Sequence, residues 1–268
     1  MNYLIIDTSY YNFYRFYATM QWYKNAYPDE NIEDIPDLSL NNIFINKFEK
    51  MFIENINKYK KQFKIDKIIY ARDCPRKDIW RNHIYSDYKI NRDPLYSAGS
   101  NFKGGPVFKH CYQYIIPKLI SKDSIEIKIP NLEADDIIYL CTQKIKSVNN
   151  NIYIISSDHD LLQLLDINYN IYLYTANLKC YNEKSKGNSD KNNFMKAVLG
   201  DTSDNIKKII PRLGEKTAEK MYNDLPLLID KFTQFPDSFK KYCINRFLVD
   251  FNYIPIQYIN DFNNKVVL

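Results

Sequence analysis

The sequence predicts an α/β fold, in which a mostly parallel central sheet is flanked by helices and followed by a helical module. Two observations carry this prediction. Short apolar runs typical of buried strands alternate with longer segments whose apolar residues recur at helical spacing, and parallel strands joined by helices give this pattern. After about residue 190 the strand pattern stops, and helical patterns alone continue to residue 268.

The elements follow one another along the first 190 residues. The first strand, Tyr3-Leu4-Ile5-Ile6, is apolar throughout, as a strand buried on both faces should be. The third strand alternates with period two, which indicates an edge of the sheet. In chain order the predicted strands are residues 3–6, 67–71, 125–129, 152–155 and 169–174, and the predicted helices are residues 40–63 and 132–144. Residues 93–106 are polar and rich in glycine, and they predict a mobile loop.

Composition excludes several classes of protein. With 45% hydrophobic and 15% aromatic residues the chain can bury a core, so intrinsic disorder is excluded. No apolar run approaches the roughly 18 residues that span a bilayer. The five cysteines form no C-x-x-C pair, which argues against a zinc ribbon or a disulfide scaffold and favours a reducing, intracellular compartment. The net charge of +5 permits a nucleic-acid partner without requiring one.

Acidic residues follow three of the predicted strands. Because the carboxyl ends of parallel strands meet at one edge of a sheet, these side chains should converge there. Others open the helix that begins near Asn131, and a last pair opens the helical module. The candidates are Asp7, Asp73, Asp158 and Asp160 after strands, Glu133, Asp135 and Asp136 in the helix, and Asp201 and Asp204 in the module.

Each acidic group also has an ordinary structural explanation. An acidic first turn stabilises a helix, and a lone aspartate after a strand is usually a turn residue. Two carboxylates 4 Å apart, however, repel by roughly 1 kcal/mol in water and roughly 4 kcal/mol at an effective dielectric near 20, so a cluster requires cations. Oxygen ligands favour Mg²⁺ or Mn²⁺, and the three scattered histidines make zinc improbable. Two Mg²⁺ ions held by carboxylates are the apparatus of phosphodiester hydrolysis.

A basic, aromatic segment leaves directly from Asp73. Residues 72–92 hold six basic and three acidic side chains, interleaved with Trp80, Tyr85 and Tyr88. Basic residues with stacking side chains suit single-stranded nucleic acid, although a solvated basic helix face would have the same composition. Because the segment follows the predicted metal ligand Asp73 directly, we interpret it as a surface that binds nucleic acid.

Residues 205–220 form a second basic segment. Within it, residues 211–218 (PRLGEKTA) look like a helix–hairpin–helix turn, which offers backbone N–H groups to a DNA phosphate. A plain turn between helices is the alternative. Arg212 stands where such turns usually have their first glycine. The predicted DNA-binding residues of this turn are Arg212, Gly214, Lys216 and Thr217.

Together these motifs resemble the flap endonuclease/5′-nuclease family, over roughly residues 2 to 222. The phage ribonuclease H branch is most similar, because residues 78–81 and 249–255 also match it. The motifs that carry the resemblance are Leu4-Ile5-Ile6-Asp7, Trp80-Arg81 with Tyr88-Lys89-Ile90-Asn91-Arg92, Leu132-Glu133-Ala134-Asp135-Asp136, Ile155-Ser156-Ser157-Asp158-His159-Asp160 and Gly200-Asp201-Thr202-Ser203-Asp204-Asn205-Ile206.

The resemblance implies a role for each candidate. The tighter metal would be held by Asp7, Asp73, Glu133, Asp135 and Asp136, and the second by Asp158, Asp160 and Asp204, with Asp201 near it through water. Lys89 and Arg81 would be catalytic, steadying charge on the scissile phosphate. Arg76, Tyr88 and Arg92 would join the hairpin in binding DNA.

The resemblance also implies the organisation and the activity. Residues 1–190 would form a PIN-like nuclease core with a helical arch at about 77–106, and residues 191–268 a helical module with the hairpin. The protein would be a cytoplasmic monomer (in the host cytoplasm if viral) that binds no membrane. It would use two Mg²⁺ ions, with Mn²⁺ as a substitute and K⁺ at the hairpin. Its substrates would be DNA with a 5′ end or flap and RNA–DNA hybrids in replication or repair. Its partners would be replication proteins, such as a single-strand-binding protein or a sliding clamp.

Two other functions stay open. A PIN-type ribonuclease shares the acidic sheet edge, but such domains are smaller and lack the hairpin. A catalytically inactive DNA junction-binding protein would have little reason to keep nine mutually repelling carboxylates. Two features depart from the family pattern: Tyr14-Arg15 comes one position late, and residues 23–38 look like an insertion.

Overall fold

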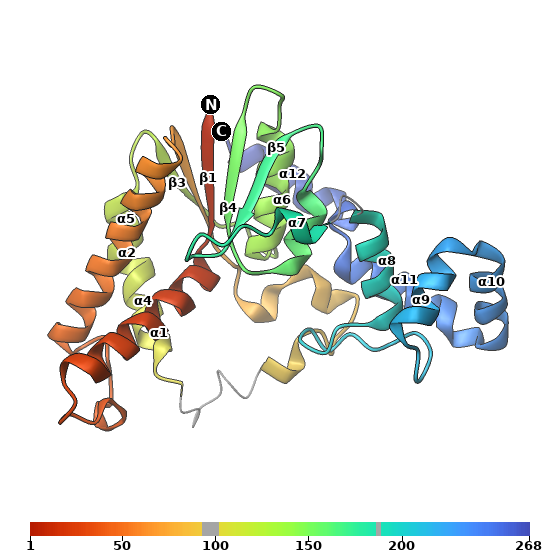
Figure 1. The fold of residues 1–268 in the computed structure, drawn as a ribbon, viewed down its shortest axis with the longest axis horizontal. Helices are drawn as coiled ribbons and strands as arrows, with labels where there is room; N and C mark the ends of the chain where they lie inside the picture. The colour runs from red at the N-terminus through yellow and green to blue at the C-terminus, as the bar shows by residue number, and fades with distance from the viewer. Residues whose placement is uncertain (93–101, 186–188) are drawn as a thin grey trace.

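The computed structural model has one sheet of five parallel strands in the order β3-β2-β1-β4-β5 (Figure 1). It describes residues 1–92, 102–185 and 189–268. The strands are β1 (Asn2–Asp7), β2 (Lys67–Ala71), β3 (Ser124–Ile127), β4 (Asn151–Ile155) and β5 (Asn170–Tyr174). All five predicted strands are confirmed, and the third does lie at an edge.

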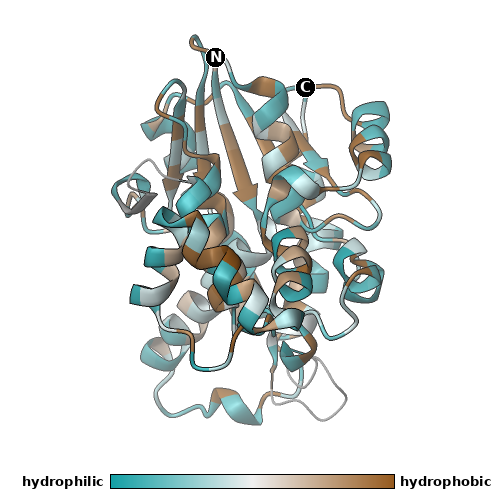
Figure 2. Ribbon diagram, turned by 90° about the vertical axis from the view of Figure 1, so that its right-hand side faces the viewer, coloured by the Kyte–Doolittle hydropathy of each residue, from teal (hydrophilic) through white to brown (hydrophobic). Residues whose placement is uncertain are grey.

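The apolar runs form strands because the sheet is covered on both faces. In β1, Leu4, Ile5 and Ile6 are fully buried, and Ile5 lies between Ile69 of β2 and Ile154 of β4. Successive side chains of a strand point to opposite faces, so one strand supplies two cores. Figure 2 shows hydrophobic strands in the upper half of the view, with helices on either side.

The two faces are covered by different helices. Leu4 and Ile6 share a core with α1 (Thr8–Ala26), α2 (Asn42–Gln62) and α4 (Gly104–His110). On the other face, Ile5 packs with α6 (Ala134–Ile145) and α12 (Ile256–Lys265). The helices predicted at residues 40–63 and 132–144 correspond to α2 and α6. Between α4 and β3 the chain forms a π-helical turn (Cys111–Ile115) and α5 (Ile116–Leu119).

The insertion predicted at residues 23–38 belongs to the core. Its first residues form the end of α1, and Ile32–Asp34 form a 3₁₀ turn. Tyr23, Ile32 and Leu38 are at most 1% exposed and pack in the core of α1 and α2. Three side chains of the segment therefore pack against α1 and α2, while most of its other residues are exposed.

The chain is helical after residue 189, as predicted. The helices α8 (Ser189–Leu199), α9 (Glu215–Asn223), α10 (Leu225–Gln234) and α11 (Pro236–Val249) surround a small apolar core of their own. By contrast, Phe262 and Val266 pack with α6 beneath the sheet. The chain thus returns to the core beside the sheet after α11, and the domain boundary at 190/191 stays a prediction. No helix in the described ranges is long and apolar enough to cross a membrane.

Two predicted DNA-binding elements differ from expectation. Over its described residues 77–92, the predicted arch has only short 3₁₀ turns (Arg76–Asp78, Trp80–His83 and Ile90–Arg92). Residues 93–101, which hold most of the predicted loop, lie outside the described part, and residues 104–106 open α4.

The hairpin prediction is not confirmed as a helix–hairpin–helix. The turn at residues 211–214 ends a connection of residues 200–214 between α8 and α9, so no helix directly precedes it. Arg212 does adopt the left-handed backbone (φ 59°) that favours glycine, in keeping with its place in the motif.

Candidate active site

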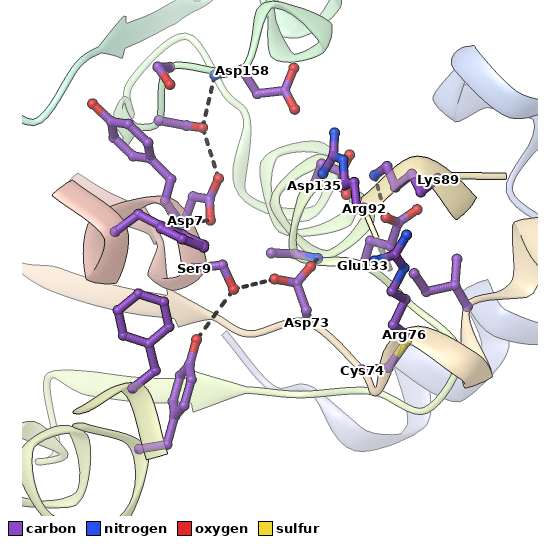
Figure 3. A pocket seen from close by; sticks show the side chains of 18 residues that line it. Asp7, Ser9, Asp73, Cys74, Arg76, Lys89, Arg92, Glu133, Asp135 and Asp158 are labelled. Atoms are coloured by element: carbon purple, nitrogen blue, oxygen red, sulfur yellow. Dashed lines mark hydrogen bonds and ion pairs between the residues drawn. The ribbon is translucent and has the colours of Figure 1, made fainter. Parts of the chain in front are cut away.

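A cavity of about 610 Å³ lies at the carboxyl edge of the sheet. Five of the nine predicted acidic residues line it, contributed by the ends of β1, β2 and β4 and by the start of α6 (Figure 3). The lining acids are Asp7, Asp73, Glu133, Asp135 and Asp158. The sheet topology thus brings these carboxylates together, as expected.

Asp7 and Asp73 end neighbouring strands, and backbone N–H groups and hydroxyls hold them. Asp7 accepts hydrogen bonds from the Tyr10 backbone N–H (3.0 Å) and the Ser156 hydroxyl (2.9 Å). Asp73 accepts from the Ala134 backbone N–H (2.7 Å) and from the Ser9 hydroxyl. Burial, with the charge of Asp73, raises the pKa of Asp7 to about 7. Burial also raises the pKa of Asp73, so without a cation both carboxyls are protonated more readily than exposed aspartates.

The first turn of α6 gathers three carboxylates. One oxygen each from Glu133, Asp135 and Asp136 lie within 4.8 Å of one another, a spacing that could hold a metal ion. Burial, with the charge of Glu133, raises the pKa of Asp135 well above its ordinary value. Burial opposes the charge on Glu133, but Lys89 and Arg81 hold its pKa at about 2.

The Arg81 guanidinium binds the Asp136 carboxylate outside the cavity. The guanidinium donates to Asp136 Oδ1 (2.8 Å) and Oδ2 (2.9 Å), and the Trp80 indole N–H donates to Oδ2 (2.9 Å). The Arg81 guanidinium also donates to Glu133 (2.9 Å) and to the Leu248 carbonyl (2.8 Å). The Arg81 side chain is 2% exposed and does not line the cavity. The predicted contact of Arg81 with a scissile phosphate and the predicted role of Asp136 as a metal ligand both stay predictions, and both would require this pairing to change.

Lys89 and Arg92 face the carboxylates from the predicted arch. Lys89 Nζ lies 2.6 Å from Glu133 and 3.9 Å from Asp204, and Arg92 Nη2 lies 2.6 Å from Asp204. The Tyr88 hydroxyl donates to Glu133 (3.2 Å). Lys89 and Arg92 line the cavity together with Arg76, which places three of the predicted basic residues beside the acids.

Lys196 was missed by the sequence analysis. From α8 it pairs with Asp160 and, at 2.7 Å, with Asp201, and neither acid lines the cavity. Burial raises the pKa of Asp160 to about 6 despite Lys196. Burial also disfavours charge on Asp201, but Lys196 and Ser203 hold its pKa at about 2. Asp160 lies 36 residues away in the sequence, so no local spacing indicates its pairing with Lys196.

The predicted hairpin residues lie elsewhere on the surface. Arg212, Gly214, Lys216 and Thr217 are all exposed, and none lines the cavity. Gly214 is the N-cap of α9 and supplies no side-chain cap. This helix terminus can meet an anion with backbone N–H groups.

Comparison with known proteins identifies the family. The family model described as "5′-3′ exonuclease, N-terminal resolvase-like domain" matches residues 2–196. The chain belongs to this family. The matched range holds the five strands of the sheet and every acid that lines the cavity.

Individual relatives agree with this assignment. The chain is 32% identical to the 5′-3′ exonuclease of Buchnera aphidicola (subsp. Acyrthosiphon pisum) over 175 residues, 64% of this chain and 57% of that protein. It is 29% identical to DNA polymerase I of Caldicellulosiruptor bescii over 200 residues, 71% of this chain and 22% of that protein. The chain spans little more than half of the first curated relatives, between 55% and 58% of their lengths.

A solved structure shares the whole fold. A flap endonuclease of bacteriophage T5, in a pseudo-enzyme–product complex with DNA and metal ions, superposes with a TM-score of 0.68 at 16% identity. The superposition covers 98% of this chain and 97% of that one, so the α-helical part after residue 189 is included in the likeness.

Proposed function

We propose that this protein is a metal-dependent 5′ nuclease that cuts DNA near a 5′ end or flap, in replication or repair. The observation that carries the proposal is the convergence of five carboxylates on one cavity that Lys89, Arg92 and Arg76 also line. Acids that hold cations, beside bases that hold phosphate, suit the hydrolysis of a phosphodiester. Family membership and the names of the relatives support it.

The donor set fits Mg²⁺, with Mn²⁺ as a substitute. The cavity acids offer carboxylate oxygens as metal ligands. Among the described residues that line the cavity there is no histidine, and Cys74 is the one cysteine. We assign Asp7, Asp73, Glu133, Asp135 and Asp158 as the residues that would hold the ions. Bound ions would lower the pKa of water and neutralise charge on the phosphate.

The remaining four acids would act around this set. Asp136, held by Arg81, would orient Glu133 through the capping box that joins their side chains and backbones. Asp204 is paired with Arg92, and Asp160 and Asp201 are paired with Lys196. These three would approach a second ion only after their basic partners move to the phosphates.

The chain's own bases would hold the substrate. Lys89 would stabilise charge that develops on the scissile phosphate, and Arg92 and Arg76 would bind its neighbours. Tyr88 is 5% exposed, which leaves it a role in holding Glu133. On the far surface, the α9 terminus with Arg212, Gly214, Lys216 and Thr217 would hold the duplex backbone, and K⁺ at that turn is part of this proposal.

A PIN-type ribonuclease and an inactive junction-binding protein are the competing functions. The test compares a 5′-labelled DNA flap, a nicked duplex and an RNA–DNA hybrid, each with Mg²⁺ and with chelator. We expect Mg²⁺-dependent cleavage near the 5′ end of the flap. Cleavage of RNA alone would favour the ribonuclease, and binding without cleavage of any substrate would favour the inactive protein.

A further inference from the structure

Two hydroxyl groups, those of Tyr112 and Ser9, connect the segment after α4 to Asp73. The Ser9 hydroxyl lies against Asp73 Oδ2, a contact visible in Figure 3. The Tyr112 hydroxyl lies 3.3 Å from Ser9 Oγ and 3.3 Å from Thr8 Oγ1. Thr8 Oγ1 in turn lies 2.6 Å from the Ala71 carbonyl.

The direction of each hydrogen bond follows from counting protons. A carbonyl oxygen only accepts, so Thr8 donates its single hydroxyl proton to Ala71. Ser9 donates its proton to the Asp73 carboxylate, which also only accepts when ionised. Both hydroxyls are then left as acceptors toward Tyr112, whose proton is shared between them. Tyr112 therefore donates to Ser9, and Ser9 donates to Asp73.

Tyr112 is fixed in place from two sides. It lies in the π-helical turn Cys111–Ile115, a rare geometry that is frequent at functional sites. The Arg72 guanidinium lies 3.9 Å from the centre of the Tyr112 ring, and Arg72 pairs with Glu126 at 3.1 Å. Arg72 directly precedes Asp73, so the same strand end carries both the carboxylate and the side chain that clamps the tyrosine.

We infer that Ser9 and Tyr112 are positioning residues for Asp73, a role that rests on the proposed function. Asp73 Oδ1 is held by the Ala134 N–H and Oδ2 by Ser9, so each oxygen keeps lone pairs for a cation. Outer partners of this kind orient a ligand and tune its affinity for metal. Because Tyr112 follows α4, the relay also ties this segment to the metal site.

The test measures Mn²⁺ binding by calorimetry without DNA, beside unfolding temperature and flap cleavage. Ser9→Ala should weaken Mn²⁺ binding by about tenfold to a hundredfold, as the loss of other outer partners does. Tyr112→Phe removes one hydroxyl and should weaken it by about twofold to tenfold. Ser9→Thr keeps the hydroxyl and should restore binding. Tyr114→Phe is the matched control, since Tyr114 lies in the same turn, is 55% exposed and does not line the cavity.

A double variant tests the relay itself. If Tyr112 acts through Ser9, Tyr112→Phe should have no further effect on Mn²⁺ affinity in the Ser9→Ala background. The inference would be overturned if Tyr112→Phe had equal effects in both backgrounds, or if its Mn²⁺ affinity equalled that of wild type and Tyr114→Phe. In either case, flap cleavage by the wild-type protein would leave the proposed function standing. A wild-type protein that neither binds Mn²⁺ nor cuts a flap would overturn both.

Discussion

Replacing Arg81 with methionine separates a structural role from a catalytic one. Methionine keeps most of the apolar stem and removes the guanidinium, which donates to Glu133, Asp136 and the Leu248 carbonyl. Asp136 is fully buried and Glu133 is 3% exposed, so water cannot replace the lost donors. Two buried carboxylates would be left with fewer partners.

The expected loss of stability is large. Removing one partner of a buried ion pair costs about 3–5 kcal/mol, against a total of about 5–15 kcal/mol for a folded domain. Arg81, with Lys89, holds the pKa of Glu133 at about 2, so the loss of Arg81 should raise that pKa in the folded state. A raised folded-state pKa makes folding more favourable at low pH, so the stability deficit should shrink as the pH falls.

Urea unfolding followed by circular dichroism measures this change. Lys118→Ala is the control, because its ion pair with Glu49 is on the surface (2.6 Å, with the Lys118 side chain 59% exposed) and should cost less than about 1 kcal/mol. An Arg81→Met protein with wild-type stability at every pH but no cleavage would refute the structural role. It would support the contact with phosphate that the family resemblance implied.

Three further predictions concern charge. Lys89→Ala should lower single-turnover cleavage by orders of magnitude with little loss of flap affinity, since it removes positive charge beside the phosphate; an unchanged rate would remove its catalytic role. Lys216→Ala should weaken duplex binding and make its salt dependence shallower by about one unit of slope, and an identical slope would count against the α9 contact. The metal-free protein should melt at lower temperature as the pH rises from 6 to 8. Burial raises the folded-state pKa values of Asp7 (to about 7) and Asp160 (to about 6) above the ordinary 3.8. Their contribution to folding stability is therefore fully present below pH 3.8 and is lost as the pH rises through 6 and 7. Calorimetric melting in chelator, with Mg²⁺ raising the transition more at pH 8 than at pH 6, checks this; a transition independent of pH would contradict it.

The sheet was predictable because its strands have a simple pattern. A strand buried on both faces contains an uninterrupted apolar run, and β1, β2 and β4 each show one after a polar first residue. Once the strands were parallel, their carboxyl ends had to share an edge, and so the convergence of Asp7, Asp73 and Asp158 followed from topology.

Helix α1 was missed because its buried face is partly polar. Asn12, Arg15 and Thr19 are at most 4% exposed there, so the apolar periodicity that marks a helix is interrupted. Arg15 lies over the Tyr14 ring at 4.3 Å, a contact no sequence spacing could have shown.

The pairing of acids with bases was also beyond the sequence. Arg81 and Asp136 are 55 residues apart, and Lys196 and Asp160 are 36 apart. Which carboxylate faces the cavity, and which faces a basic residue, depends on how the elements pack. The residue types at the site were therefore predictable, but their division into inner and outer groups required the structure.

If the carboxylates at the sheet edge form a metal-loaded cleavage centre, removing one of them should stop cleavage. The experiment measures single-turnover cleavage of a 5′-labelled flap by Asp73→Ala, with flap affinity measured in parallel. We expect cleavage to be abolished at saturating Mg²⁺ while flap binding is preserved. Full activity of Asp73→Ala would contradict the assignment of this cavity as the active site.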